Sequence, residues 1–354
     1  MSGTDGEQRA FLGSFTSAGG HGITAVRVDT ETGALSAPRH TDAVPDPSYL
    51  TLAPGGAYLY AVSETEPGAA AALATRGTEA PGPPEPLGAP VPVDGDGPTH
   101  LALAAGRLFT ANYVSGTVSA LRVRADGALD AGPYTHAHKG SGPNAERQEG
   151  PHAHAVVPDP SGQWLLSVDL GTDSVWTYDL RDTEAGPRPH GETALRPGSG
   201  PRHLAFRPGV PHRAYVINEL DSTVTTCRWD ADAGVLEPRG ETRTLPLEAA
   251  GEGNFPSALA LSPDGRFAWA ANRGDDSVAV LALEDGEGLP EFVTTVPCGG
   301  HWPRDLAVHP SGRWLYAANE RSGDVTWFTV DPETGVPRAT GRLDAPAVSN
   351  VVFG

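Results

Sequence analysis

The sequence has little positive charge, few cysteines and no long apolar segment. It holds 25 Lys and Arg against 44 Asp and Glu in 354 residues, so its formal net charge is −19. This charge repels the phosphates of nucleic acids and of anionic lipids, so we expect neither nucleic acid nor membrane as a partner. An anionic small molecule would need a local cluster of arginine or histidine that works against the overall field.

Two cysteines, Cys227 and Cys298, are too few for a disulfide framework. The N-terminus lacks a basic stretch followed by an apolar one, so no signal peptide is visible. No apolar run approaches the roughly 18 residues that span a bilayer. We therefore expect a cytoplasmic protein, either a monomer or a weak homodimer.

Helical periodicity is also missing, whereas turn residues are abundant. Apolar residues at i, i+3, i+4 and i+7 are almost never sustained, so long helices are not expected. The 44 glycines and 34 prolines separate short runs rich in Val, Leu, Thr, Tyr and Trp. Short strands between frequent turn signals predict an all-β protein.

A repeat of about fifty residues organises the chain. It reads FPSALALSPDGRFAWAANRGDDSVAVLAL from Phe255 and WPRDLAVHPSGRWLYAANERSGDVTWFTV from Trp302. Its leading prolines are 47 to 55 residues apart, at Pro47, Pro98, Pro151, Pro201, Pro256 and Pro303. This period is typical of propeller blades, each a four-stranded antiparallel sheet.

Six full units leave both chain ends unmatched. The strands expected over residues 11–35 lack an innermost strand, and the C-terminal APAVSNVVFG resembles such a strand with nothing after it. Joining the two closes a seven-bladed β-propeller and removes its free sheet edges. We expect one domain over residues 1–354, with blades at 9–46 plus 345–354, 47–96, 97–149, 150–199, 200–254, 255–301 and 302–344. We interpret the Ala/Pro-rich stretch from Glu64 to Asp96 as a weak third strand and a long loop of the second blade.

The repeat also predicts where side chains converge. The first strand of each unit lines the channel and the second returns antiparallel to it, so the start of the first and the end of the second face one mouth. Counting six residues back from the proline of the first turn selects Ser48, His154, Arg202, Ser257 and Arg304, with Thr99 as the counterpart in a shorter unit. The second strands end at Ser63-Glu64, Asn112-Tyr113, Asp169-Leu170, Asn218-Glu219, Asn272-Arg273 and Asn319-Glu320.

One mouth thus gathers a histidine, three arginines and two glutamates: His154, Arg202, Arg273, Arg304, Glu219 and Glu320. In a chain of such negative charge, this cluster predicts a site for carboxylate or phosphate. His154 beside Glu219 offers a general acid or base near neutral pH. We expect the Asn and Asp residues at the second-strand ends to make structural hydrogen bonds, and Arg304 and Glu320 could simply pair with each other.

These residues resemble the seven-bladed propeller lactonase family. The family includes cycloisomerase-type 6-phosphogluconolactonases and the carboxy-muconate lactonising enzyme. The most specific stretch is GSGPNAERQEGPHAHAVVPDPSG, followed in the family's order by PRHLAF, YVINELDSTV, PSALALSPDGRF and AANRGDDSV. The resemblance covers the chain from about Phe11 to Phe353.

The resemblance implies lactone chemistry without metal or cofactor. It assigns the catalytic roles to His154, Arg202, Glu219 and Arg273. Candidate substrate contacts around these motifs are His152, His203, Arg304, Glu320, Gln148 and Asn112. The expected partner is a small anionic lactone or carboxylate.

Two directions of reaction stay open. In hydrolysis, His154 takes a proton from water, or Glu219 does so while His154 orients, and the arginines hold the anionic group and the developing oxyanion. In the reverse, muconate-type direction, the same groups protonate carbon while a substrate carboxylate closes the ring. We expect hydrolysis of a sugar-acid lactone such as 6-phosphogluconolactone, with a cycloisomerase and a non-catalytic binding propeller as alternatives.

Two His-Ala-His runs, His136/His138 and His152/His154, could each place two imidazoles on one face of a strand, as zinc or nickel ligands require. The register places no acidic residue beside the first pair, so we expect no metal site. We expect both cysteines to be packing residues.

Overall fold

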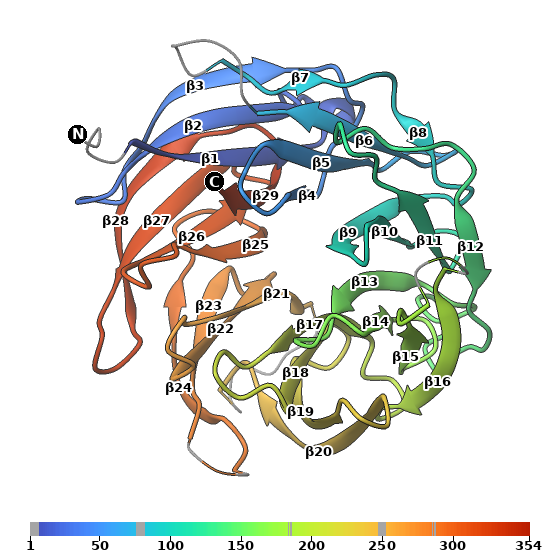
Figure 1. The fold of residues 1–354 in the computed structure, drawn as a ribbon. Helices are drawn as coiled ribbons and strands as arrows, with labels where there is room; N and C mark the ends of the chain where they lie inside the picture. The colour runs from blue at the N-terminus through green and yellow to red at the C-terminus, as the bar shows by residue number, and fades with distance from the viewer. Residues whose placement is uncertain are drawn as a thin grey trace.

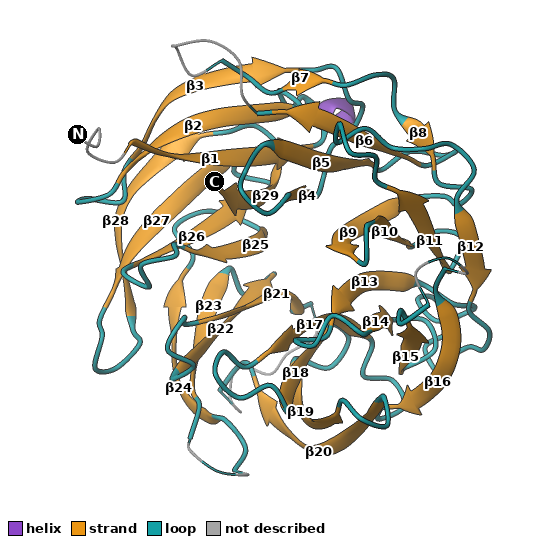
Figure 2. Ribbon diagram, in the orientation of Figure 1, coloured by secondary structure: helices purple, strands orange, loops and turns teal. Residues whose placement is uncertain are grey.

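Antiparallel sheets follow one another around a ring (Figure 1). The computed structural model describes residues 7–75, 82–182, 184, 186–246, 253–284, 286 and 288–354. Loops join the strands, and the one helix in these ranges is the short 3-10 helix η1 (Thr16–Ala18) (Figure 2). None of the helical structure in these ranges is long and apolar enough to cross a membrane.

The first three blades, each written from the channel outward, have these strands. Blade 1 holds β29 (Val348–Phe353), β1 (Glu7–Ser14), β2 (Ile23–Asp29) and β3 (Leu35–Thr41). Blade 2 holds β4 (Leu50–Leu52), β5 (Tyr58–Ser63) and β6 (Ala69–Ala74), with β7 (Glu85–Pro86) and β8 (Val91–Pro92) both paired to β6. Blade 3 holds β9 (Pro98–Ala104), β10 (Arg107–Asn112), β11 (Thr117–Arg122) and β12 (Tyr134–Ala137).

The other four blades repeat the same order. Blade 4 holds β13 (Ala153–Pro158), β14 (Trp164–Asp169), β15 (Ser174–Asp179) and β16 (Arg188–Ala194). Blade 5 holds β17 (Pro201–Phe206), β18 (Arg213–Asn218), β19 (Thr223–Asp230) and β20 (Val235–Arg243). Blade 6 holds β21 (Phe255–Leu261), β22 (Phe267–Arg273), β23 (Ser277–Ala282) and β24 (Glu291–Pro297). Blade 7 holds β25 (Pro303–Val308), β26 (Trp314–Asn319), β27 (Asp324–Val330) and β28 (Pro337–Asp344).

The two chain ends close the ring in blade 1. Strand β29 pairs antiparallel with β1, with Ala10 opposite Phe353. It also contacts the innermost strands of both neighbouring blades, β25 and β4 (Figure 1). The predicted seven-bladed propeller and its composite blade are therefore confirmed. The third strand predicted in the Ala-rich stretch is β6, whereas residues 76–81 of the loop lie outside the described residues.

The core consists of apolar layers between neighbouring blades. In β22, Phe267, Trp269 and Ala271 pack toward blade 7, while Ala268 and Ala270 pack toward blade 5. Because successive side chains of a strand point to opposite faces, a strand between two blades must be apolar on both. The outermost strands face solvent instead, and most of β16 is exposed. This arrangement leaves the strand ends at the channel free to carry polar side chains.

Candidate active site

A β-bulge at the start of the innermost strand leaves one side chain outside the regular pairing in several blades. In blade 5, Pro201 pairs with Asn218 and His203 with Ile217, so Arg202 is the extra residue. The pairing skips His154, Arg304, Thr99 and Ser349 in the same way in four other blades. Bulges bend a strand and redirect a side chain, and they are common beside active sites.

We call the seven residues at this position the bulge ring: Ser349, Ser48, Thr99, His154, Arg202, Ser257 and Arg304. Five of them line one small cavity, which places them around a common axis. The count back from the turn proline, with Thr99 as the counterpart in the shorter unit, selects every member of the bulge ring except Ser349. The channel continues below the ring as a cavity of about 510 Å³ lined by residues of six innermost strands, including Tyr49, His100 and Asp305.

Four members of the ring connect neighbouring blades by hydrogen bonds. Thr99 Oγ1 donates to the His154 carbonyl at 3.2 Å, and Ser257 Oγ donates to the Pro303 carbonyl at 2.6 Å. Ser349 Oγ donates to the Ser48 carbonyl at 2.8 Å, and Arg202 donates to the Ser257 carbonyl. These four side chains connect the ring from blade to blade.

Glu219 lies at the centre of a buried arginine cluster. Its Oε2 accepts a hydrogen bond of 2.6 Å from Arg273 and lies 3.0 Å from Arg202 Nε, while Oε1 accepts one of 2.6 Å from Arg147. Burial opposes ionisation of this carboxyl, but the three guanidinium groups outweigh it and lower its pKa to about 2. Glu219 is therefore a carboxylate at neutral pH, with both oxygens occupied.

The cluster leaves Arg202 and Arg273 well enclosed. Their side chains are 3% and 8% exposed, against 35% for Arg147. Burial, with repulsion from Arg273, lowers the pKa of Arg202 to about 9 despite its carboxylate partner. Arg273 also donates from Nε to the Phe255 carbonyl at 2.9 Å. Both arginines are held in place before any ligand arrives.

A second ion-pair group lies across the mouth. Arg304 donates to Glu320 at 3.1 Å, lies 3.7 Å from Glu64, and stacks over the Phe15 ring at 4.8 Å. Glu64 also accepts a hydrogen bond from Ser48. Burial raises the pKa of Glu64, although Arg304 opposes the rise. Arg304 and Glu320 do pair with each other, and they do so inside the mouth.

Two members of the bulge ring, Arg202 and His154, have a buried nitrogen without a hydrogen-bond partner among the described residues. Arg202 Nε lies 3.0 Å from the Glu219 carboxylate, whereas His154 Nδ1 has no ionic partner within these residues either. His154 is 6% exposed. Burial, reinforced by Arg202, Arg304 and Arg273, holds the pKa of His154 well below its usual range. The imidazole is therefore neutral at neutral pH and able to accept a proton.

Aromatic and imidazole rings surround His154. Tyr113 lies edge-on at 5.4 Å between ring centroids and stacks on His152 at 4.5 Å. His203 lies at 5.6 Å on the channel side, followed by His100 at 5.2 Å from His203. Burial lowers the pKa of His203 and lowers that of His100 to about 3. The His152 Nδ1–H donates to the Tyr113 carbonyl at 2.9 Å.

Two predicted substrate contacts have structural roles instead. Asn112 is fully buried and hydrogen-bonds to Thr110, Thr117 and Ser119. Gln148 is also fully buried: its Nε2 donates to the Leu170 carbonyl at 2.8 Å, and its Oε1 accepts from the Asn144 amide. Neither side chain has an exposed atom for a ligand, and Gln148 instead shapes the loop that carries Arg147.

The other second-strand amides behave as the sequence predicted. Their side chains hydrogen-bond to hydroxyl or carboxylate groups of the third strand, in Asn218, Asn272 and Asn319. Asp169 accepts from the backbone amides of His152, Gly171 and Thr172. These contacts fix the shape of the loops around the mouth.

The expectation that no acidic residue lies beside His136 and His138 was wrong. His138 Nδ1 lies 2.6 Å from Asp169 Oδ2, and both histidines hydrogen-bond to Tyr178. Asp169 ends a strand of blade 4, whereas the two histidines lie in or just after a strand of blade 3. A count within one repeat therefore could not bring them together. Within the described ranges, no group of three or more His, Cys, Asp and Glu side chains could hold a metal ion. Cys227 and Cys298 are both buried, as expected.

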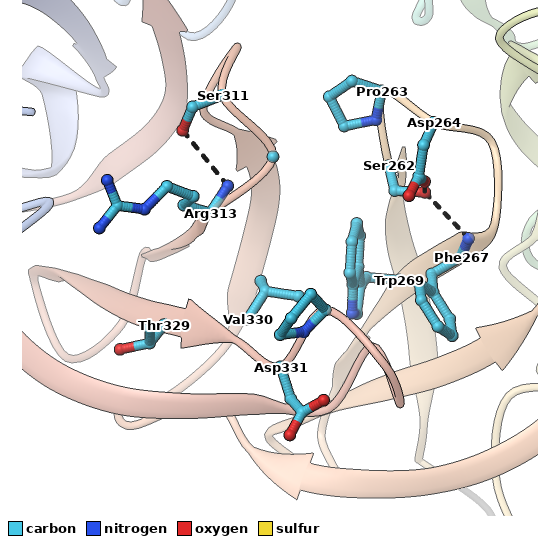
Figure 3. Close-up of a pocket in the computed structure, with 12 residues that line it drawn as sticks. Ser262, Pro263, Asp264, Phe267, Trp269, Ser311, Arg313, Thr329, Val330 and Asp331 are labelled. Atoms are coloured by element: carbon cyan, nitrogen blue, oxygen red, sulfur yellow. Dashed lines mark hydrogen bonds between the residues drawn. The ribbon is translucent and has the colours of Figure 1, made fainter.

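The count along the repeat reached Glu64 and Tyr113 as second-strand ends, but the predicted site did not include them. Arg147 comes from a connection between blades whose length differs, and no repeat position marks it. Trp302 directly precedes the leading proline Pro303, outside the two strand ends that the count collected. A further cavity of about 350 Å³ lies at the turns that end the first strands of blades 6 and 7 (Figure 3), and no predicted site residue lines it.

Comparison with known proteins gives the family. The family model described as "Lactonase, 7-bladed beta-propeller" matches residues 9–353. The chain belongs to this lactonase family. The resemblance inferred from the motifs is thereby confirmed.

Relatives of this lactonase chain carry two kinds of name. It is 34% identical over 296 residues to a Bacillus subtilis protein named 6-phosphogluconolactonase, a match that covers 82% of each chain. A solved structure described as a periplasmic gluconolactonase of Pseudomonas aeruginosa is 30% identical, with a TM-score of 0.90 over 98% of this chain and 99% of that one. A Bacteroides fragilis structure matches with a TM-score of 0.91 at 30% identity, over 100% of this chain and 99% of that chain.

Proposed function

We propose that this protein hydrolyses a sugar-acid lactone at the mouth that carries His154. The observation that carries the proposal is the buried Nδ1 of His154, which has no partner among the described residues. Buried polar atoms are nearly always hydrogen-bonded, so an unpartnered one favours a bound water or ligand at that point. Membership of a lactonase family gives the reaction class.

The reaction needs a base, an oxyanion site and an acid. Neutral His154 takes a proton from water while the water oxygen bonds to the lactone carbonyl carbon. Negative charge then develops on the carbonyl oxygen, where a guanidinium stabilises it. The ring C–O bond breaks as the carbonyl re-forms, and the imidazolium returns the proton to the departing ring oxygen. The product is a hydroxy acid, which releases its carboxyl proton to solvent.

Glu219 is a positioning residue in this mechanism. Both of its oxygens already accept hydrogen bonds from guanidinium groups, whereas His154 Nδ1 has no partner among the described residues. Of the two bases considered from the sequence, His154 is therefore the better supported. The Glu219 carboxylate contacts both Arg202 and Arg273 through Oε2 and so keeps the two guanidinium groups oriented.

The more accessible arginines suit the anionic part of the substrate. The side chains of Arg304 and Arg147 are 20% and 35% exposed, whereas that of Arg202 is almost fully buried. Arginine matches carboxylate and phosphate with paired hydrogen bonds. The names of the relatives point to gluconolactone or its 6-phosphate.

The test is a pH-stat assay on 6-phosphogluconolactone, gluconolactone and a carboxymuconolactone, corrected for spontaneous opening. We expect rapid opening of a sugar lactone, and a decrease in kcat of about 10²–10⁴-fold in His154→Asn. His301→Asn is the matched control, because the His301 side chain is 74% exposed. Activity should fall only below about pH 6.5, as His154 becomes protonated, and EDTA should leave it unchanged.

Other outcomes would identify the alternatives. Turnover of the carboxymuconolactone alone would favour a cycloisomerase. Absence of turnover on the whole panel would favour a binding propeller. Full activity in His154→Asn would remove His154 from the chemistry.

A further inference from the structure

Trp302 stands at a backbone position that disfavours a large side chain. It precedes β25 and has φ of 64°, in the left-handed region. The same position carries Gly97 and Gly200 in blades 3 and 5, both also at positive φ. A bulky residue with this conformation is strained by roughly 1–3 kcal/mol, and such strain clusters at functional sites. The Trp302 amide donates to Asp276 Oδ1 at 2.7 Å, which holds this conformation.

The indole of Trp302 lies against two arginines. Arg321 Cζ is 3.4 Å from the ring centroid, and Arg273 Cζ is 5.5 Å from it. Arg273 belongs to the buried cluster around Glu219, whereas Arg321 is exposed. The ring therefore connects the catalytic mouth to a second guanidinium at its rim.

Arg321 carries a charge that no described carboxylate neutralises. Its neighbour Glu320 points to Arg304 instead, at 3.1 Å. Stacking on an indole holds a guanidinium in place while its N–H donors stay free. An arginine restrained in this way binds an anion with less loss of side-chain entropy than a free one.

Arginines outnumber glutamates at the mouth, and this excess of positive charge favours a doubly charged anion. Arg147, Arg202, Arg273 and Arg304 face three glutamates, Glu64, Glu219 and Glu320. Arg321 adds a further positive charge at the rim. A neutral sugar lactone would leave this excess uncompensated, whereas a phosphate group would neutralise it.

We propose that Arg321, held by Trp302, binds the exocyclic phosphate of the lactone and so selects phosphorylated over unphosphorylated substrates. Arg321 is the specificity-determining residue and Trp302 positions it. This inference rests on the proposed lactonase function. It offers one rim position at which members of a family with both kinds of name could separate phosphorylated from unphosphorylated lactones.

The test compares the binding of 6-phosphogluconate and gluconate by calorimetry. We expect the wild type to prefer the phosphorylated acid, and Arg321→Gln to lose about tenfold or more of its affinity for 6-phosphogluconate while gluconate binding is unchanged. Trp302→Gly should give the same loss, because glycine adopts the left-handed backbone and only the ring is removed.

Arg313→Gln is the matched control. Arg313 is also exposed and stacks on a tryptophan, Trp314, at 5.0 Å, but it lies at the cavity on the turns of blades 6 and 7 (Figure 3). It should change neither affinity. Inorganic phosphate serves as a further probe: competition with 6-phosphogluconate in the wild type but not in Arg321→Gln is expected.

Equal losses for both acids, or no loss in Arg321→Gln, would overturn the inference, as would a wild type with no preference between them. Both acids are hydrolysis products, so their binding needs no turnover. The lactone assay therefore decides the proposed function, and the binding assay decides the phosphate subsite.

Discussion

Glu219 shows how one buried carboxylate can hold a cluster of arginines together. Three arginines from separate segments meet on its two oxygens. Taking a charge out of water is costly, and a buried ion that loses its partner costs several kcal/mol. Arg202 and Arg273 therefore depend on Glu219 more than Arg147 does, since Arg147 reaches solvent.

We predict that Glu219→Gln lowers the free energy of unfolding by about 3 kcal/mol, because it leaves the buried guanidiniums without their counter-charge. Arg147→Gln, which removes the exposed partner of the same carboxylate, should cost about 1 kcal/mol or less. Urea denaturation monitored by tryptophan fluorescence measures both. Equal costs for the two variants would show that burial does not set the strength of this cluster.

At the scale of the strand, the bulge ring both connects neighbouring blades and carries residues of the candidate site. In six of the blades the register shifts at the start of the innermost strand, where hydroxyl groups join blades and where His154 and Arg304 lie. A regular strand would alternate these side chains between the two apolar layers instead. The same irregularity thus builds the ring and exposes the site.

Ser257→Ala tests the structural part of this device. The variant removes the hydrogen bond to the Pro303 carbonyl and should lower the free energy of unfolding by about 1 kcal/mol while kcat changes little. Ser36→Ala on the exposed outer strand β3 is the control and should be neutral. Chemical denaturation and the lactone assay give the two quantities. An unchanged unfolding midpoint in Ser257→Ala would mean that this hydrogen bond does not stabilise the ring.

The repeat explains how far the site could be predicted from the sequence. Counting from a turn proline selects His154, Arg202 and Arg304 because the strand and its turn keep a constant length. Arg147 lies in a connection of variable length, so no count reaches it, and Trp302 stands before the leading proline, outside the strand ends that the count collects. The role of Glu219 also depends on which arginines surround it, and three-dimensional charge balance is not a property of spacing. The fold, in contrast, follows from the repeat and the unmatched ends alone.

At the scale of the whole molecule, the channel concentrates buried histidines. His100, His154 and His203 are all held neutral, and burial is the largest cause of the lowered pKa in each. The unfolded chain binds protons to these groups near pH 6.5, whereas the folded protein does so only at lower pH. Protonation therefore favours the unfolded chain.

We predict that stability is constant at neutral pH and falls as the pH drops below about 6.5, by about 1.4 kcal/mol per pH unit for each histidine. Glu219 adds to the loss between pH 4.5 and about 2, because its pKa is lowered in the folded state. Urea midpoints measured from pH 8 to 4 test this. His301→Gln, at an exposed position, should keep the slope, and a flat profile between pH 6.5 and 5 would contradict the prediction.

Ring closure makes the last strand essential. Deleting residues 348–354 would expose the β1 edge and remove Asn350, whose Oδ1 accepts from the Leu50 amide and whose Nδ2 donates to Asp305 at 2.8 Å. We expect the shortened chain to aggregate or to unfold without cooperativity, because a free sheet edge replaces a closed ring. Removing Gly354 alone is the control. Cooperative unfolding of the chain without 348–354 would show that six blades and a partial seventh hold together unaided.

The meeting of both ends in blade 1 has a consequence for the order of the chain. The Gly354 amide donates to the Arg9 carbonyl at 2.8 Å, so the described segments next to both ends of the chain lie side by side. The charged residues of the mouth come from blades 2 and 4 to 7 and from the connections between blades, away from these segments. A circularly permuted gene, with the old ends joined by a short linker and new ends opened in a surface loop, would encode the same site.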